Sequence, residues 1–393
     1  MTVISKAFTA VDFAGELFEI MIRLYPAVGE LERYEFEYAL ANLLPQEGWE
    51  SIQLEDPQEL EHKLSSRNFY ESIKTSQKVN GRIILDPQVI HLTRMLFVGL
   101  VSQAYSEEWV AGHFYFDVRG FLFFHRTRYF TREVIAHFGG KPLMQFEAGQ
   151  PRFDTFQGIG YADFKAANAE IDQAFIAGVL KIVAARGTPI LLTLAGPTAA
   201  GKTEIMERLY AAFEEHGQKI TTVEMDNFLV DREARGEKPL GIETSHFDLF
   251  KQFLNDILQR RSAVIPRYDF IKATSSHDLA GNLRPGCSPL VVEPADIIFI
   301  EGNFPFQIRE INDLIGIKVV YLTDDPVRLK RKWKRDIDYR KKYDPNFFLN
   351  RFFKTQFLRA DDCYRLQMQA CEIVVDTTLA SLWVTPEIAK LIR

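Results

Sequence analysis

The stretch "LAGPTAAGKTEIMERL", residues 194–209, decides the fold expected of this chain. It fits the spacing G-x-x-x-x-G-K-[ST], with Gly196, Gly201, Lys202 and Thr203 at the fixed positions. The apolar run "PILLTLAG" ahead of the loop is typical of a buried parallel strand. Behind the loop, apolar residues recur at helical spacing: Ile205, Met206, Leu209, Tyr210 and Phe213. This order of strand, loop and helix predicts a phosphate-binding loop.

The physical basis is the backbone of such a loop. Glycines let it turn tightly, so that its N–H groups meet an anion at the positive end of the following helix. Lys202 would reach the β- and γ-phosphates of ATP, and the Thr203 hydroxyl would bind Mg²⁺. The residues expected to contact the nucleotide are Gly196, Pro197, Thr198, Ala199, Ala200, Gly201, Lys202 and Thr203. The alternative is an ordinary glycine-rich turn that carries a solvated lysine.

Composition restricts the partners. The 393 residues include 47 basic and 53 acidic side chains, and the resulting net charge of −6 demands neither a nucleic acid nor an anionic membrane. The three cysteines form no C-x-x-C pair, which argues against a disulfide framework and a structural zinc site. Acidic residues interrupt the apolar N-terminal stretch, so it resembles neither a signal peptide nor a membrane span. We expect a cytoplasmic protein that binds a small-molecule acceptor, with the homo-oligomeric state left open.

Length suggests two or three domains. Residues 146–161 gather Gly, Pro and polar side chains and form the best candidate linker. We therefore predict an N-terminal α+β domain of unknown role over residues 1–160 and a second domain over 161–393. In the first, "HFYFDVRGFLFFHRTRYF" predicts an aromatic hairpin that turns near Gly120, with a buried face favoured over a binding surface. In the second, an opening helix stops at Gly187 and buries one face: Phe164, Ile171, Phe175, Val179 and Ile182.

Five apolar runs alternate with helical stretches after residue 188. They are residues 189–196, 219–226, 295–302, 317–325 and 371–378. The alternation predicts an α/β fold, a five-stranded mostly parallel sheet between helices, with ligands at the carboxyl ends of the strands.

Two carboxylates stand at such ends. Asp226 can accept a proton from a substrate hydroxyl or hold Mg²⁺ through water, whereas Glu301 can support the metal or the substrate. The alternatives are a turn cap at Asp226 and an ordinary charged strand end at Glu301.

The segment "VRLKRKWKRDIDYRKK", residues 327–342, is strongly basic in an acidic chain. Four of its cations share one helical face: Arg328, Arg331, Lys332 and Arg335. We expect this helix to fold over the phosphates and to neutralise charge on the transferring group, with Arg335 in a catalytic role. A solvated basic helix or a nucleic-acid patch remains the alternative.

Together, residues 190 to 376 resemble the uridine kinase and phosphoribulokinase group of P-loop kinases. The resemblance rests on GPTAAGKT, the aspartate of "VEMDNF", "VIPRYDF", "EPADIIFIEG" and "RLKRKWKRDIDYRKK". It implies that residues 161–393 form a P-loop kinase domain that uses ATP and Mg²⁺ and phosphorylates an alcohol group. Lys202 and Thr203 would serve ATP and Mg²⁺, and Asp226 would be the catalytic base.

The resemblance also implies an acceptor pocket and a lid. Tyr268 and Phe270 would border the acceptor, Glu301 would support the metal or acceptor, and the lid would contain Arg331, Arg335, Arg340 and Lys342. Lys332 stands where uridine kinases usually have arginine.

Two other departures affect acceptor recognition. Ile242 replaces the aspartate that binds ribose hydroxyls in uridine kinases, and Ala273 replaces the histidine that reads the pyrimidine. We therefore expect an acceptor other than uridine, such as a sugar, a sugar phosphate or a modified nucleoside.

Two alternative functions stay open. The loop also resembles that of tRNA dimethylallyltransferases, which transfer a prenyl group, but those enzymes follow it with D-S-x-Q and this chain has "MDNF". An ATP-binding regulatory or scaffolding module without turnover would need the loop but not Asp226.

Overall fold

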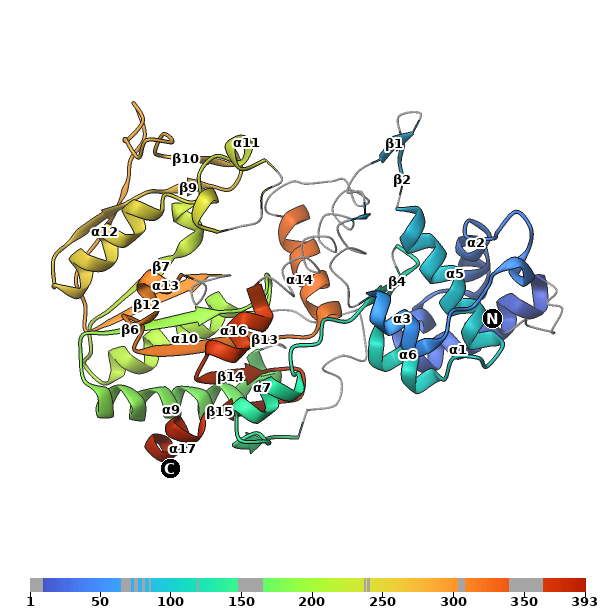
Figure 1. Ribbon diagram of the computed structural model, residues 1–393, viewed down its shortest axis with the longest axis horizontal. Coiled ribbons are helices and arrows are strands. Elements are labelled where there is room, and N and C mark those ends of the chain that lie inside the picture. Colours follow the sequence, from blue (N-terminus) through green and yellow to red (C-terminus); the bar gives the residue numbers. More distant parts are fainter. Residues whose placement is uncertain are drawn as a thin grey trace.

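The computed structural model describes residues 10–64, 72–73, 77–79, 82–84, 86–118, 120–147, 165–236, 238, 241–302, 308–338 and 363–393. Figure 1 shows a layered α/β part, here called the sheet body (described residues from 129 onward), beside a mostly helical part, the N-terminal module (described residues 10–128). The helix α14 (Asp325–Asp338) lies between the two.

A seven-stranded sheet forms the centre of the sheet body. Its order is β5 (Met144–Gln145), β15 (Ser381–Val384), β14 (Ile373–Asp376), β13 (Ile317–Leu322), β6 (Ile190–Ala195), β12 (Ile297–Gly302) and β7 (Ile220–Glu224). The five strands from β14 to β7 are parallel and are the five that the sequence predicts, so the expected α/β fold is confirmed. The sequence did not predict β15 and β5, which extend one edge in antiparallel pairs.

Helices cover both faces of this sheet because its central strands are apolar on both sides. Ile190, Leu192 and Leu194 of β6 pack with α9 (Ala169–Arg186), α10 (Lys202–Glu215) and α17 (Pro386–Ile392). Leu191 and Ala195 face α7 (Arg132–His137), α12 (Phe247–Leu258), α13 (Arg309–Asn312) and α16 (Arg365–Ala370).

Helix α9 buries the predicted face at residues 171, 175, 179 and 182 and ends before Gly187. Phe164 and most of the predicted linker lie outside the described residues.

Short elements follow the carboxyl ends of the strands. After β7 come η3 (Met225–Phe228), α11 (Arg232–Arg235) and η4 (Ile242–Thr244). Between α12 and β12 are two small antiparallel pairs, β8 (Ala263–Ile265) with β11 (Leu290–Val292) and β9 (Tyr268–Asp269) with β10 (Thr274–Ser275). Of these elements, η3 lies beside both β12 and β9, next to the carboxyl end of β7.

The N-terminal module combines helices with two small hairpins. Its elements are α1 (Ala10–Leu24), η1 (Pro26–Glu30), α2 (Arg33–Ala41), η2 (Trp49–Ser51), α3 (Pro57–Leu64), β1 (Gln77–Val79), β2 (Arg82–Ile84), α5 (Pro87–Val101), α6 (Glu107–His113), β3 (Phe114–Asp117) and β4 (Leu122–His125).

The predicted aromatic hairpin is present as the antiparallel pair β3 and β4, with Gly120 in the turn region. Every residue of both strands is buried. The ring of Phe97 packs against Trp49 and three phenylalanines around the hairpin. The aromatic side chains thus form a core, as expected, and not an exposed binding surface.

The predicted division at residue 160 stays a prediction, because residues 148–164 are not described. Residues before that point nevertheless pack on the sheet body: Val134 and Phe138 lie in its core, and Met144 pairs with Leu382. In the described parts of the chain, no helix combines the length and the apolar character needed to cross a membrane.

Candidate active site

The phosphate loop leaves the carboxyl end of β6, the central strand, and enters α10 at Lys202. Gly196 has a φ of +149°, and a Cβ there would lie 2.3 Å from the backbone oxygen of Tyr321. Gly201 caps the helix in the left-handed region, at φ +105°. The strand, loop and helix therefore adopt the predicted order, and both fixed glycines occupy conformations that side chains rarely adopt.

Lys202 lies inside the loop and is 7% exposed. Its ammonium group donates to the carbonyl oxygens of Gly196 and Pro197, at 3.1 and 3.2 Å. Burial lowers the pKa of Lys202, and the charges of Glu301 and Asp226 partly oppose that shift. A cation held in this way is only partly compensated, so it suits an incoming phosphate.

Carboxylates face the loop from the next two strands. Glu301 ends β12 and accepts a hydrogen bond from the Thr203 hydroxyl at 2.9 Å, and its other oxygen lies 3.9 Å from the Lys202 nitrogen. Burial raises the pKa of Glu301, and Asp226 adds to the shift. Glu224, opposite Glu301 in the sheet, has a pKa raised by desolvation and by the charges of Glu301 and Asp226. Negative charge is therefore concentrated where a metal ion would relieve it.

Asp226 lies in η3, just after β7. It belongs to the same electrostatic cluster as Glu301, Glu224 and Lys202. The neighbouring Asn227 accepts a hydrogen bond from the Tyr268 backbone N–H at 3.3 Å. The η3 turn that carries Asp226 thus lies beside β9, and the charge of Asp226 acts on Lys202 in the phosphate loop.

Helix α14 places arginines on the loop. Arg331 donates to the Ala199 carbonyl oxygen at 3.1 Å and to the Glu204 carboxylate at 2.7 Å. Arg335 lies 3.5 Å from the Thr198 hydroxyl, with its side chain 41% exposed. Lys332 instead pairs with Asp336 at 3.2 Å. Arg340 and Lys342, the other predicted lid residues, lie outside the described residues.

The predicted acceptor wall consists of Tyr268 and Phe270, whose ring centroids are 5.2 Å apart. Tyr268 is buried, and its hydroxyl accepts a hydrogen bond from Arg235 of α11 at 2.5 Å. The Arg235 guanidinium carbon lies 5.3 Å from the centre of the same ring. Ile242 is 44% exposed in η4, and Ala273 has a positive φ of 58°.

These residues fit Mg²⁺ and a nucleoside triphosphate. Within the described ranges, no group of three or more His, Cys, Asp or Glu side chains is arranged to hold a metal ion alone. Protein-bound Mg²⁺ usually keeps several waters and adds only one or two carboxylates to substrate phosphates. Thr203 and Glu301 provide such a partial set, and the buried Lys202 ammonium in the loop provides a cation for the phosphates.

Several residues of the site were not predicted. Glu224 is two positions before Asp226 in the same strand end, so the sequence already contained that signal. Arg235 gave none, because its position over Tyr268 depends on how α11 and β9 meet. Arg328 was placed on the correct face of its helix, but nothing in the sequence indicates that it is completely buried.

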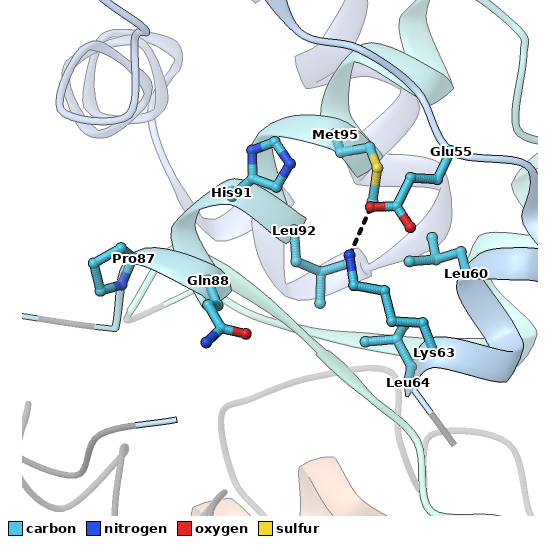
Figure 2. A pocket seen from close by; sticks show the side chains of 9 residues that line it. All are labelled: Glu55, Leu60, Lys63, Leu64, Pro87, Gln88, His91, Leu92 and Met95. Carbon is cyan, nitrogen blue, oxygen red and sulfur yellow. Dashed lines mark hydrogen bonds and ion pairs between the residues drawn. The ribbon is translucent and has the colours of Figure 1, made fainter. Parts of the chain in front are cut away.

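A separate cavity of about 250 Å³ lies in the N-terminal module between α3 and α5. Figure 2 shows its apolar side chains, among them Leu60, Leu64 and Leu92, and the 2.7 Å ion pair of Lys63 with Glu55. It contains none of the residues above and is distinct from the candidate active site.

Comparison with known proteins identifies kinases that are similar to this chain. A model of the Phosphoribulokinase / Uridine kinase family matches residues 191–378, from β6 to just after β14. The uridine kinase of Lactobacillus helveticus (strain DPC 4571) is 32% identical over 158 residues, with 39% of this chain and 70% of that protein covered. The uridine kinase of Streptococcus agalactiae serotype V is 29% identical over 164 residues, covering 39% and 71%. The solved structure of D-glycerate 3-kinase from Cryptococcus neoformans var. grubii serotype A aligns with 55% of this chain and 99% of its own, at 14% identity and a TM-score of 0.39.

Proposed function

The chain belongs to the Phosphoribulokinase / Uridine kinase family, and on that premise we propose that it transfers the γ-phosphoryl group of ATP to a hydroxyl of a small metabolite other than uridine. Membership makes it a phosphotransferase with an alcohol group as acceptor. The observation that supports our assignment of residues is the meeting of Lys202, Thr203 and Glu301 at the carboxyl ends of β6 and β12, beside Asp226.

Each residue has one role in this proposal. The loop N–H groups from Gly196 to Thr203 hold the phosphates of ATP, and Lys202 exchanges its carbonyl partners for phosphate oxygens. Thr203 and Glu301 would hold Mg²⁺ together with the phosphates, and the ion would supply positive charge to neutralise them. Asp226 accepts the proton of the acceptor hydroxyl. The hydroxyl oxygen forms the new bond to the γ-phosphorus, and the bond between that phosphorus and the leaving ADP breaks.

The acceptor pocket lacks the groups that would select uridine. A site that pairs a polar group with a substrate hydroxyl discriminates by factors of about 10⁴, and neither Ile242 nor Ala273 supplies such a group. Arg235, in contrast, brings a cation over the aromatic wall. Its Nε is buried and has no hydrogen-bond partner among the described residues. Of the candidate acceptors, this favours a sugar phosphate, whose anionic group can bind the guanidinium.

The nucleotide part of the proposal is tested by calorimetric titration of Mg·ATP. We expect Lys202→Ala to weaken binding at least tenfold, because the variant loses a buried charge-assisted contact. Lys219→Ala is the matched control: it removes the same charge at the exposed start of β7, near the amino ends of the strands. Equal affinities of Lys202→Ala and the control would remove Lys202 from the nucleotide site.

A further inference from the structure

Helix α14 has two sides with different partners. On one side its arginines lie on the phosphate loop. On the other side Leu329, 1% exposed, is part of the apolar core of the N-terminal module. Figure 1 shows the helix between the sheet body and the module, next to the β3–β4 hairpin. Any displacement of the module therefore acts on the helix that contacts the loop.

The loop side of α14 is held by backbone contacts. Arg328, which is completely buried, donates to the carbonyl oxygens of Thr323 at 3.0 Å and Thr198 at 3.3 Å. Arg331 donates to the next loop carbonyl, that of Ala199. Carbonyls held outward in this way leave the N–H groups of the loop to face inward, toward a phosphate.

The module side is held at the start of the helix. Arg126, just after β4, places its Nη1 2.8 Å from both carboxylate oxygens of Asp324. Its Nε donates to the carbonyl oxygens of Ala111 and Phe114, both at 3.1 Å, which fixes the guanidinium within the module.

The next residue extends this contact. The Thr127 backbone N–H donates at 3.0 Å to Asp325, the first residue of α14. The other oxygen of Asp325 is ion-paired with Arg328. Arg328 also donates a hydrogen bond to the Tyr129 hydroxyl, at 3.4 Å.

These contacts form one continuous path: Arg126 and Thr127 hold Asp324 and Asp325, Asp325 holds Arg328, and Arg328 holds the loop at Thr198. We propose that the N-terminal module is a working part of the nucleotide site, in which Arg126 is a positioning residue that fixes α14 and thereby keeps the phosphate loop in its nucleotide-binding shape. The inference rests on the proposed function, because it presupposes that the loop binds ATP.

The test is Arg126→Ala in the full-length chain, with Mg·ATP affinity measured by calorimetry. Without Arg126 the partly buried Asp324 loses its counter-charge and the start of α14 is released. We expect about tenfold weaker nucleotide binding and faster hydrogen exchange of the loop amides at 198–203. Arg23→Ala is the control: it breaks an arginine–glutamate pair of 2.5 Å that is confined to the module, and it should leave both measurements unchanged.

A double-mutant cycle separates positioning from general loss of stability. Asp324→Asn alone should weaken Mg·ATP binding severalfold, and the double variant should lose no more than Arg126→Ala, because both changes break one contact. If Arg126→Ala does not fold, Asp324→Asn supplies the same test. Wild-type affinity in every folded variant would overturn the inference and leave the proposed function intact. A wild-type chain that binds no Mg·ATP would overturn both.

Discussion

In the absence of a ligand, burial disfavours the charged forms of Lys202 and Glu301. Burial lowers the pKa of the first and raises that of the second, so each is pushed toward its neutral form. A phosphate beside Lys202 and a Mg²⁺ ion beside Glu301 would reverse both shifts. Perturbed groups of this kind, placed at the carboxyl ends of parallel strands, are characteristic of functional sites.

Burial also disfavours the charged form of Asp376, which lies at the end of β14 and outside the phosphate loop. Burial raises its pKa to about 6, although the backbone N–H of Thr378 donates to it at 2.9 Å. The protonated form is thus favoured in the folded chain, and its stabilising effect is lost as the pH rises through 6.

We therefore expect Asp376→Asn to be more stable than wild type at pH 8, by on the order of 2 to 3 kcal/mol. The asparagine keeps the acceptor oxygen and has no charge to desolvate. Urea unfolding at about pH 8 and about pH 4 measures the difference, which should nearly vanish at the lower pH. A difference that is the same at both pH values would show that ionisation of Asp376 is not its cause.

At the scale of an element, the phosphate loop depends on the close approach of β13. A methyl group on Gly196 would meet the backbone carbonyl of Tyr321 in β13, a strand paired on both sides within the sheet. We expect Gly196→Ala to lower the free energy of unfolding by at least about 2 kcal/mol and to abolish Mg·ATP binding. Thermal unfolding and calorimetry check this against Gly112→Ala in α6, where a Cβ has open space. Equal stability of the two variants would contradict the close contact.

On its loop side, helix α14 should contribute to turnover through Arg335. Arg335 reaches Thr198 and remains partly exposed, so it is available to a phosphoryl group in transfer. We expect Arg335→Ala to reduce kcat by about 10² to 10³. Lys334→Ala, which removes an exposed cation from the same helix, should change kcat by less than about twofold. Steady-state kinetics, with melting curves to confirm that both variants fold, measures the difference. Equal kcat values for the two variants would show that Arg335 takes no part in phosphoryl transfer.

Across the whole molecule, the features that could be predicted from the sequence are those with a regular apolar period or a short motif. The loop, the five parallel strands and the aromatic hairpin each depend on residues close together in the chain. The contact between the module and α14 does not, because Arg126 and Asp324 are 198 positions apart and no local pattern links the two segments in which they lie. Strand β5 was missed because two residues are too short to show a period, whereas β15 was missed although it is as long as the predicted β14.

The candidate site divides in the same way. Motifs were sufficient to name Lys202, Thr203, Glu301 and Asp226, because the carboxyl ends of neighbouring parallel strands lie at the same end of the sheet. The buried Arg328 and the Arg235 cation over Tyr268 depend on tertiary packing, which no local pattern reports. Motifs therefore predict the candidate catalytic residues, but neither the packing of Arg235 on Tyr268 nor the contact of the N-terminal module with α14.

The central claim is tested most directly by acceptor-dependent ADP release, measured across a panel of sugars, sugar phosphates and nucleosides with wild type and Asp226→Asn. We predict turnover with an acceptor other than uridine or cytidine, and a kcat about 10² to 10⁴ lower in Asp226→Asn at similar ATP affinity. Uridine turnover with kcat/KM of about 10⁴ M⁻¹s⁻¹ or more would contradict the acceptor assignment. ADP release that no acceptor stimulates, or that Asp226→Asn leaves unchanged, would contradict the account of the site itself.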